Sequence, residues 1–385
     1  MNEILERLNR GTADDRLNAL SDIISSEKEH PARSPQYANN HIHTFYSFSP
    51  YSPTAAVYFA RAATLMTAGI MDHDSIAGAK EFIKAGEIAD VGTTVGLECR
   101  VSMKGTPLEG RRINNPDQDS VAYMALHSVP HKNIDILQNA FAPCREKRNV
   151  RNRKMTDNIN SVIGEFGLYI DFDNDVLPLS RFSEGGSVTE RHLIYAVCQK
   201  VIEAAGKDGT ADFVEKGLKI NLSEKQRSQL SDPENPYFEY DLLGVLKADF
   251  VGRIYVPATD ECMHISELSS LAKEVGALLC YAYLGDVTDS VTGDKRAQKF
   301  EDDYLDLLFD TLTKEGIDAV TYMPSRNTPA QLKRIQDMCR LRGITEISGE
   351  DINSPRQKFI CKQLEQPEFR HLIDATWMLI KRERM

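Results

Sequence analysis

Residues 266–283 read SELSSLAKEVGALLCYAY, and this stretch decides the fold class. Its first part carries apolar side chains at helical spacing, Gly276 follows, and an apolar run of strand length comes next. A glycine just beyond a helix is the usual left-handed cap. The same order recurs in residues 300–323 and 328–348. Helix, glycine and strand in succession predict parallel βα units, and therefore a parallel sheet or barrel.

The N-terminal half of the chain shows the same alternation of helix and strand signals, but less regularly. Ser52 and Pro53 supply an N-cap and a proline at the first helical position, so a helix is predicted to begin there. Gly69 is expected to end this helix before a short strand. A second predicted helix, over residues 76–89, precedes the strand TTVGL, which is expected to end at Glu98.

The middle of the chain lacks this alternation of helix and strand signals, which suggests an insertion. Residues 140–250 are rich in charged residues and helix formers, so they are interpreted as an inserted, mostly helical subdomain. The βα units on either side, residues 38–139 and 251–385, are assigned to one domain. Residues 1–37 are predicted to be an N-terminal helical extension that packs against it.

Composition and charge narrow the classes of function. The chain has 385 residues, of which 41% are hydrophobic, so it can bury a sizeable core. Its formal net charge of −11 argues against bulk nucleic-acid or membrane-surface binding, but allows a small phosphorylated ligand at a local positive site. Seven scattered cysteines without a CxxC pair, and no signal peptide or membrane span, lead us to expect a reduced, cytoplasmic protein.

Four groups of imidazole or carboxylate residues follow separate predicted strands. His41 and His43 alternate along one strand and so face the same side. His73, Glu98 and Asp351 lie at the ends of three other strands. The carboxyl ends of barrel strands are where barrel enzymes assemble their sites. Imidazole with carboxylate suits zinc, manganese or iron, so these residues predict a divalent-metal site.

These motifs also resemble a known family. The resemblance is carried by the His-x-His pair, by Asp72-His73-Asp74-Ser75, by Gly96-Leu97-Glu98 and by the late Asp351. In this order they are similar to the PHP family of metal-dependent phosphoesterases, over residues 38–130 and 250–355. The resemblance implies an α/β fold, a distorted (β/α)7 TIM-like barrel with up to three metal ions. The implied reaction is hydrolysis of phosphate esters by a metal-activated water.

The resemblance also assigns metal ligands residue by residue. A first metal would be held by the ligands His41, His43, Glu98 and Asp351. His73 would bind a second metal, and His127 would add a further imidazole, with His131 as the alternative. Asn353 occupies the place of a final family histidine and can offer an amide oxygen.

Three positions depart from the family pattern. An Asp or His usually follows the His-x-His pair, but Phe48 or Ser49 stands there, and Tyr283 replaces a late histidine. Together with Asn353, these changes remove ligands mainly from the second and third metals. The expectation is therefore one complete metal site, with Tyr283 offering a phenol to substrate.

Candidate phosphate-binding residues lie in the insertion and after a late strand. Arg145 and Arg148 share one face of a basic helix, which is either a phosphate clamp or a solvated face paired with acids. Arg191 and His192 open a later helix and resemble a substrate-phosphate contact of some family members, with a helix-end histidine as the alternative. Arg326 follows the strand that ends near Met323, on the same edge of the barrel.

The resulting prediction is a hydrolase of a small phosphorylated metabolite, a nucleotide or a short oligonucleotide. The main alternative is a degenerate barrel that binds metal and a phosphorylated ligand without cleaving it. A second alternative is an amidohydrolase-like barrel, which is less favoured because no lysine-ligand signal accompanies the His-x-His pair. The sequence makes no prediction of oligomeric state.

Overall fold

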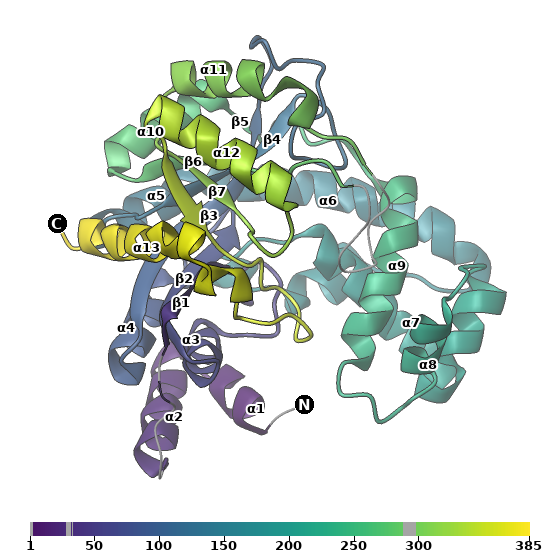
Figure 1. Cartoon of the computed structure of the whole chain (residues 1–385). Coiled ribbons are helices and arrows are strands. Elements are labelled where there is room, and N and C mark those ends of the chain that lie inside the picture. Colours follow the sequence, from purple (N-terminus) through teal and green to yellow (C-terminus); the bar gives the residue numbers. More distant parts are fainter. Residues whose placement is uncertain (1–2, 28–31, 33, 288–297) are drawn as a thin grey trace.

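The computed structural model describes residues 3–27, 32, 34–287 and 298–385, and forms an α/β barrel with a helical insertion (Figure 1). The strands are β1 (Ser34–Ile42), β2 (Leu65–His73), β3 (Gly92–Ser102), β4 (Val121–His127), β5 (Met263–His264), β6 (Leu278–Ala282), β7 (Ala319–Tyr322) and β8 (Thr345–Ser348). Their order in the sheet is β1-β2-β3-β4-β6-β7-β8, with β5 paired to β3. A parallel bridge between Ile42 and Ile352 brings the two edges together. The predicted (β/α)7 TIM-like fold class is therefore confirmed.

Helices pack outside this sheet. They are α3 (Pro53–Ala62), α4 (Ala79–Ala89), α5 (Ile134–Ala140), α10 (Ile265–Val275), α11 (Leu305–Glu315), α12 (Pro329–Arg342) and α13 (Arg370–Glu383). The glycine caps predicted from the repeating pattern are confirmed, because Gly276, Gly316 and Gly343 adopt left-handed backbone angles just after α10, α11 and α12. Local sequence signals therefore set the ends of the helices that separate the late strands.

Three local expectations were wrong. Strand β4 runs antiparallel to both of its neighbours, β3 and β6, so the sheet is not wholly parallel. Glu98 lies inside β3, because pairing with β4 and β5 extends that strand to Ser102. Gly69 lies inside β2, where a Cβ would come within 2.8 Å of the Asn40 Cα. Its small size thus allows β1 to approach β2, and α3 has already ended at Ala62.

The N-terminal helices pack against the barrel. Helix α1 (Glu3–Asn9) and helix α2 (Ala13–Ser26) contribute leucines to the main hydrophobic core. A buried ion pair joins Arg16 of α2 to Glu81 of α4, at 2.6 Å between Nη2 and Oε2. Strand β1 begins at Ser34, within the region that the sequence assigned to the extension.

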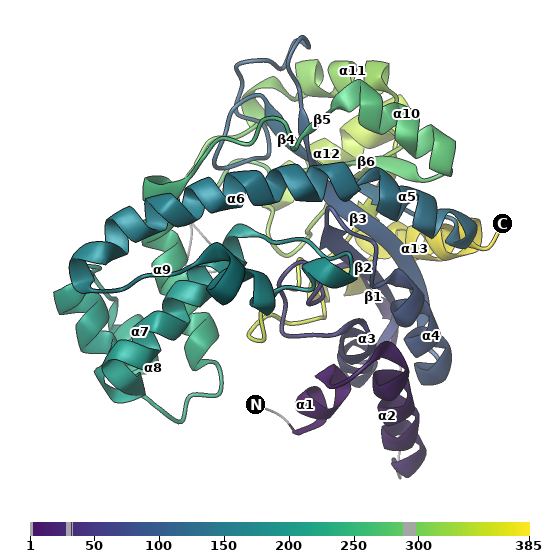
Figure 2. The same ribbon diagram turned by 180° about the vertical axis from the view of Figure 1, so that it is seen from behind.

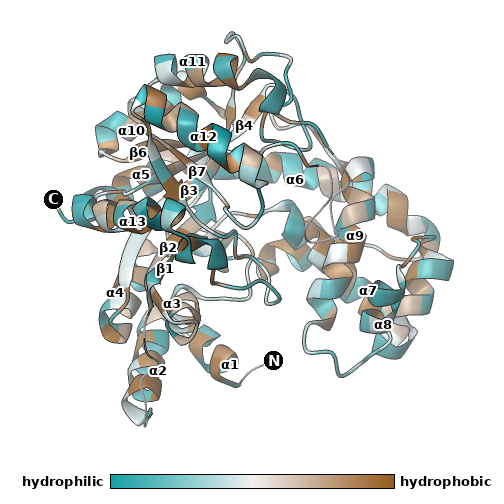
Figure 3. Ribbon diagram, in the orientation of Figure 1, coloured by the Kyte–Doolittle hydropathy of each residue, from teal (hydrophilic) through white to brown (hydrophobic). Residues whose placement is uncertain are grey.

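The insertion is built mainly from four helices and has a hydrophobic core of its own. These are α6 (Ala142–Ile163), α7 (Glu190–Asp212), α8 (Glu224–Leu230) and α9 (Phe238–Ile254). Helix α6 runs from the barrel into the insertion (Figure 2). Apolar residues of α6, α7 and α9 form the second core, and Figure 3 shows hydrophobic segments along α7 and α9. Among the described residues, no helix is both long and apolar enough to cross a membrane.

Candidate metal centre

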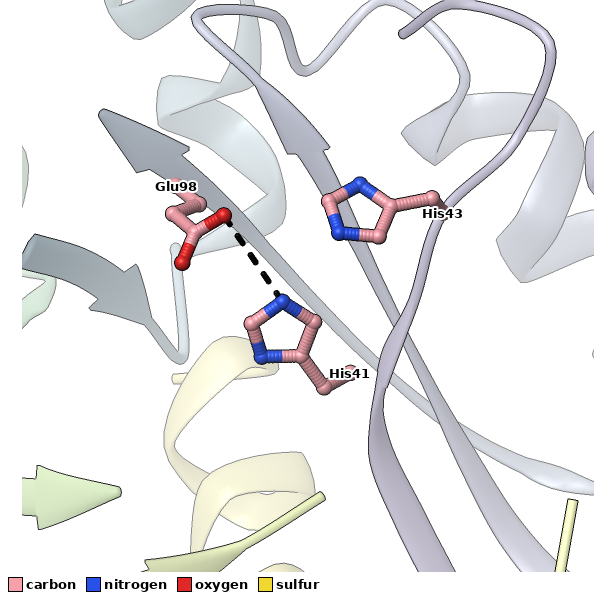
Figure 4. A group of neighbouring side chains, drawn as sticks. All are labelled: His41, His43 and Glu98. Carbon is pink, nitrogen blue, oxygen red and sulfur yellow. Dashed lines mark ion pairs between the residues drawn. The ribbon is translucent and has the colours of Figure 1, made fainter. Parts of the chain in front are cut away.

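Three side chains converge at one edge of the barrel. His41 lies in β1, His43 directly follows that strand, and Glu98 lies in β3. Their ligand atoms all lie within 4.8 Å of one another, and the three residues are buried. Figure 4 shows the side chains turned toward a common space, with His41 Nε2 3.8 Å from Glu98 Oε2. Two imidazoles and a carboxylate at this spacing could hold a divalent metal ion.

His73 joins the same group from the end of β2. Parallel register sets His73 beside Glu98, and the His73 Nδ1 lies 3.0 Å from Glu98 Oε2. The ring centroids of His43 and His73 are 4.6 Å apart. Glu98, a predicted ligand of the first metal, therefore also contacts the histidine predicted for the second.

Closure of the sheet adds Asp351. This residue follows β8, and its Oδ1 lies 3.3 Å from His43 Nε2. Backbone hydrogen bonds on either side of Ile352 hold the segment, since the His43 N–H donates to the Ile352 carbonyl and the Ile352 N–H donates to the His41 carbonyl. The first predicted ligand set is therefore gathered at one place.

The environment of His43 determines which ring nitrogen faces the site. Asp72 accepts the Ser47 hydroxyl at 2.6 Å, so the Ser47 oxygen is left to accept from His43 Nδ1 at 3.1 Å. Asp72 also accepts two hydrogen bonds from Thr44, which fix the carboxylate. A proton on Nδ1 leaves the Nε2 lone pair for a metal, the arrangement that outer-shell partners commonly impose on ligating histidines. Asp72 thus orients His43.

Ser47→Ala should lower metal affinity by about 10- to 100-fold, the usual cost of losing an outer-shell partner. The loss follows because the imidazole of His43 would no longer be held in one tautomer and orientation. Titration of the chelator-treated protein with Zn²⁺ or Mn²⁺ measures this affinity. Ser187→Ala is the matched control, since the buried Ser187 hydroxyl has no hydrogen-bond partner in the described part of the chain. Equal affinities of the two variants would contradict the role given to Ser47.

The protonation states around the site suit metal binding. Burial would raise the pKa of Glu98, but the hydrogen bond from His73 and the nearby His41 and His43 lower it to about 2. Burial lowers the pKa of His41. Burial would lower the pKa of His43, but the hydrogen bond with Asp351 and the negative charges of Asp351, Glu98 and Asp72 together raise it. A metal ion would replace the proton shared by those two groups, since ligands bind metals in their deprotonated forms.

Two further predicted ligands carry buried polar atoms with no hydrogen-bond partner among the described residues. These atoms are His127 Nε2 and Asn353 Oδ1. Burial, reinforced by His41, lowers the pKa of His127 to about 3, so its ring stays neutral. The Asn353 amide nitrogen donates to Asp351 Oδ1 at 2.6 Å. Unpaired buried acceptors are costly in a protein interior, and a bound cation would satisfy them.

Phe48 and Tyr283, which stand where the family pattern has metal ligands, have their side chains in other contacts. Phe48 has a positive φ of 82° and packs its ring edge-on against His192, with centroids 5.0 Å apart. Phe48 belongs to the core of the insertion. The Tyr283 hydroxyl donates to Asp302 Oδ1 at 2.6 Å. Neither side chain is among the residues that converge on Glu98.

The Arg145 and Arg148 side chains are buried, so this face of the basic helix is not solvated, although Arg148 does pair with acidic residues as that alternative expected. Arg145 donates to the Asp74 carbonyl at 2.9 Å. Arg148 donates to the Asp74 carboxylate at 2.5 Å and to Glu190 at 3.0 Å. These contacts use donors that a substrate phosphate would need, and they join α6 to the residue that follows His73.

Glu190 is the centre of a buried ion-pair network that the sequence analysis missed. It pairs with Arg148, Arg151 and Arg100, and the last two also pair with Glu261 at 2.9 and 2.5 Å. Burial would raise the pKa of Glu190, but these arginines hold it well below its usual range. No local pattern marked Glu261 or Arg100, although the acid next to Arg191 was visible in the sequence TERH.

Arg191 and His192 have different environments. His192 is buried in the first turn of α7, where its Nδ1 accepts from the Thr189 N–H at 2.9 Å and caps the helix. Arg191 is half-buried and makes no hydrogen bond or ion pair with any residue that the structure describes. Burial would raise the pKa of Asp351, but His43, His41 and, to a smaller extent, the charge of Arg191 lower it. Arg326 lies in the loop after β7 and is partly exposed.

Comparison with known proteins supports the fold. No protein-family model and no curated protein sequence matches the chain. Among solved structures, it is similar to a protein from Bifidobacterium adolescentis assigned as a metal-dependent phosphoesterase, with 17% identity and a TM-score of 0.56 over 89% of this chain and 98% of that chain. It is also similar to an amidohydrolase from Chromobacterium violaceum, solved with sulfate and without metal, with 14% identity and a TM-score of 0.56 over 88% and 96% of the two chains. At such identities the likeness is one of fold.

Proposed function

We propose that this protein is a metal-dependent hydrolase that cleaves phosphate esters. The observation that carries the proposal is the convergence of His41, His43, His73, Glu98 and Asp351 at one edge of the barrel. His127 Nε2 and Asn353 Oδ1, which are buried and have no hydrogen-bond partner among the described residues, support the presence of a cation. Similarity in fold to a metal-dependent phosphoesterase agrees with this reaction class.

The proposed metal is zinc, manganese or iron, held first by His41, His43, Glu98 and Asp351. When bound, such an ion activates water and neutralises charge on a phosphoryl group. Glu98 remains ionised across the physiological pH range because of its lowered pKa. Ser47 keeps the His43 Nε2 lone pair directed at the site. His73 and His127 are the proposed residues for a second ion.

Arg191 is the proposed phosphate contact. It differs from Arg148 in having no hydrogen bond or ion pair to the described part of the chain. Its guanidinium is near enough to Asp351 to affect the pKa of that carboxyl group. A planar guanidinium donates two parallel hydrogen bonds to a phosphate group, so Arg191 can orient the substrate at the metal centre.

Phosphoesterase activity is tested with p-nitrophenyl phosphate and bis-p-nitrophenyl phosphate. The chelator-treated protein is reconstituted separately with Zn²⁺, Mn²⁺ and Fe²⁺, and a p-nitroanilide is measured in parallel. Metal-dependent release of p-nitrophenol from either phosphate supports the proposal. Cleavage of the anilide alone would instead place the protein with the amidohydrolase that shares its fold.

Arg191→Ala should raise the KM for the phosphate ester that is cleaved by at least about ten-fold, the cost expected for a charge-assisted hydrogen bond. Metal content should not change, because Arg191 donates no ligand atom. Arg253→Ala is the control, since Arg253 is exposed and its contacts are local, an ion pair with Asp249 one helical turn away and the ring of Phe250. An unchanged KM for Arg191→Ala would remove this residue from the substrate site.

Binding without cleavage is the second candidate function. The positions of Phe48 and Tyr283 favour it, because neither side chain replaces the family ligand that the resemblance expects there. In that case, metal and phosphate would bind and no ester would be cleaved under any of the three metals. The reconstitution experiment therefore separates the two candidates.

A further inference from the structure

A cavity of about 1000 Å³ lies between the barrel and the insertion. Its walls come from α1, from residues 50–51 before α3 and from the end of α3, from Lys207 of α7, from residues 233–240 before and within α9, and from the segment 355–362 after the metal-binding segment. None of the predicted metal ligands lines it. The cavity is within the size range of small-molecule sites in proteins.

Aromatic side chains form both walls. On the barrel side, the Tyr51 ring lies 5.4 Å from those of Phe59 and Phe359, centroid to centroid. On the insertion side, Tyr237 and Tyr240 line the cavity. Walls of this kind can enclose a planar ring, because base–aromatic stacking tolerates any ring with a π-face.

Three tyrosine hydroxyl groups supply polar contacts. Among the described residues, the hydroxyls of Tyr51, Tyr237 and Tyr240 make no hydrogen bond. Burial and then Tyr237 raise the pKa of Tyr51 to about 12, and burial raises the pKa of Tyr240. Unused hydroxyls on a largely aromatic surface suit a ligand that carries its own polar groups.

The insertion side of the cavity is held in place by an ion pair. Arg356 pairs with both carboxylate oxygens of Asp241 at 2.6 Å and lies 4.6 Å over the Tyr237 ring. This contact joins the loop after the metal-binding segment to α9. The cavity is therefore preformed, and a ligand would not have to order its walls.

The cavity is lined by equal numbers of negatively and positively charged residues. The acidic residues are Glu6, Glu234 and Glu239, and the basic residues are Lys207, Lys358 and Lys362. Because these charges cancel, a second anionic group on a ligand would gain little electrostatic attraction in the cavity. The cavity suits a neutral ligand group with a planar ring and hydroxyls.

Two connections lead from the cavity to the metal centre. Gln357 lines the cavity and accepts the Asn353 N–H at 2.7 Å, while the Asn353 amide donates to Asp351. On the opposite wall, Tyr240 lies in α9, which packs against α7, the helix that carries Arg191, the proposed phosphate contact. A ligand with its ring in the cavity could direct a phosphate group toward Arg191 and Asp351.

We propose that this cavity binds the nucleoside part of a nucleotide whose phosphate reaches the metal centre. This inference rests on the proposed function, because the metal centre gives the phosphate its direction. Aromatic rings on both walls, tyrosine hydroxyls that make no hydrogen bond to the described residues, and balanced charge together distinguish a nucleoside from an alkyl chain or a second phosphate.

Binding of adenosine to the chelator-treated full-length protein, measured by calorimetry, tests the cavity without any turnover. Adenosine should bind saturably, and ribose should bind at least about ten-fold more weakly because stacking of the base is lost. Tyr237→Ala should weaken adenosine binding by at least about ten-fold, and Tyr51→Phe by about five-fold, the loss expected for one hydrogen bond. Tyr58→Phe is the control, because Tyr58 is a tyrosine of α3 that does not line the cavity.

The two proposals fail in different ways. Absence of adenosine binding, or binding that neither tyrosine variant weakens, overturns the nucleoside site even if p-nitrophenyl phosphate is cleaved. Adenosine binding that both variants weaken supports the site even if no phosphate ester is hydrolysed. Equal binding of ribose and adenosine would also overturn it, because the base would then contribute nothing.

Discussion

His41→Ala is expected to lower bound metal from about one equivalent per chain to less than about a tenth, and to lower phosphoester hydrolysis by more than about a hundred-fold. The variant removes a buried imidazole whose Nε2 faces Glu98 at the centre of the proposed site. Loss of an outer-shell partner alone costs up to about 100-fold, so loss of a ligand should cost more. Elemental mass spectrometry on protein purified without chelator measures the first effect.

The control for this experiment is His371→Ala. His371 is partly exposed and pairs with Glu346, away from the His41 group. That variant should retain its metal and its activity. If His41→Ala retained both as well, the metal centre would be placed wrongly, and the phosphoesterase proposal would lose the observation that carries it.

Glu190→Ala is expected to lower the free energy of unfolding by about 3–5 kcal/mol, the usual cost of breaking a buried ion pair from one side. Removal of this carboxylate leaves Arg148 and Arg151, both almost fully buried, with less compensating charge. Arg100 in β3 would lose one of its two acidic partners. Denaturant unfolding followed by circular dichroism measures the change.

Glu184→Ala provides the comparison for an exposed ion pair. Glu184 pairs with Arg181 three residues away, and the side chains of Arg181 and Glu184 are 34% and 46% accessible to solvent. Exposed pairs contribute about 0–1 kcal/mol, so this variant should be close to the native protein. A destabilisation of the same small size for Glu190→Ala would mean that Arg148 and Arg151 find other partners, and that the network does not hold α6 and α7 to the barrel.

The βα architecture was predictable because its signals are local. The glycine caps at Gly276, Gly316 and Gly343 each follow an apolar helical pattern, and the left-handed conformation they adopt needs no distant contact. The direction of β4 was not predictable in this way. An antiparallel strand and a parallel strand bury the same apolar residues, so only the pairing of β4 with β3 and β6 decides between them.

The roles of the basic helix show a second limit of local patterns. Arg145 and Arg148 were recognisable as one face of a helix, but the partners of that face are residues far away in the sequence. Asp74 lies in the barrel and Glu190 in a later helix of the insertion. A charge pattern therefore indicates that a buried or bound anion is needed, without indicating whether a carboxylate of the chain or a substrate supplies it.

The sequence by itself determined the set of candidate metal ligands, since His41 and His43 follow from period-two alternation and Glu98 from its place in a βα unit. Only the tertiary structure decided that Asp351 comes within 3.3 Å of His43, that Phe48 turns into the insertion and that aromatic residues line both sides of a cavity. The physical reason is the range of the contacts. Strand alternation and helix caps act between neighbours along the chain, whereas barrel closure and packing of the insertion join segments that only the folded chain brings together.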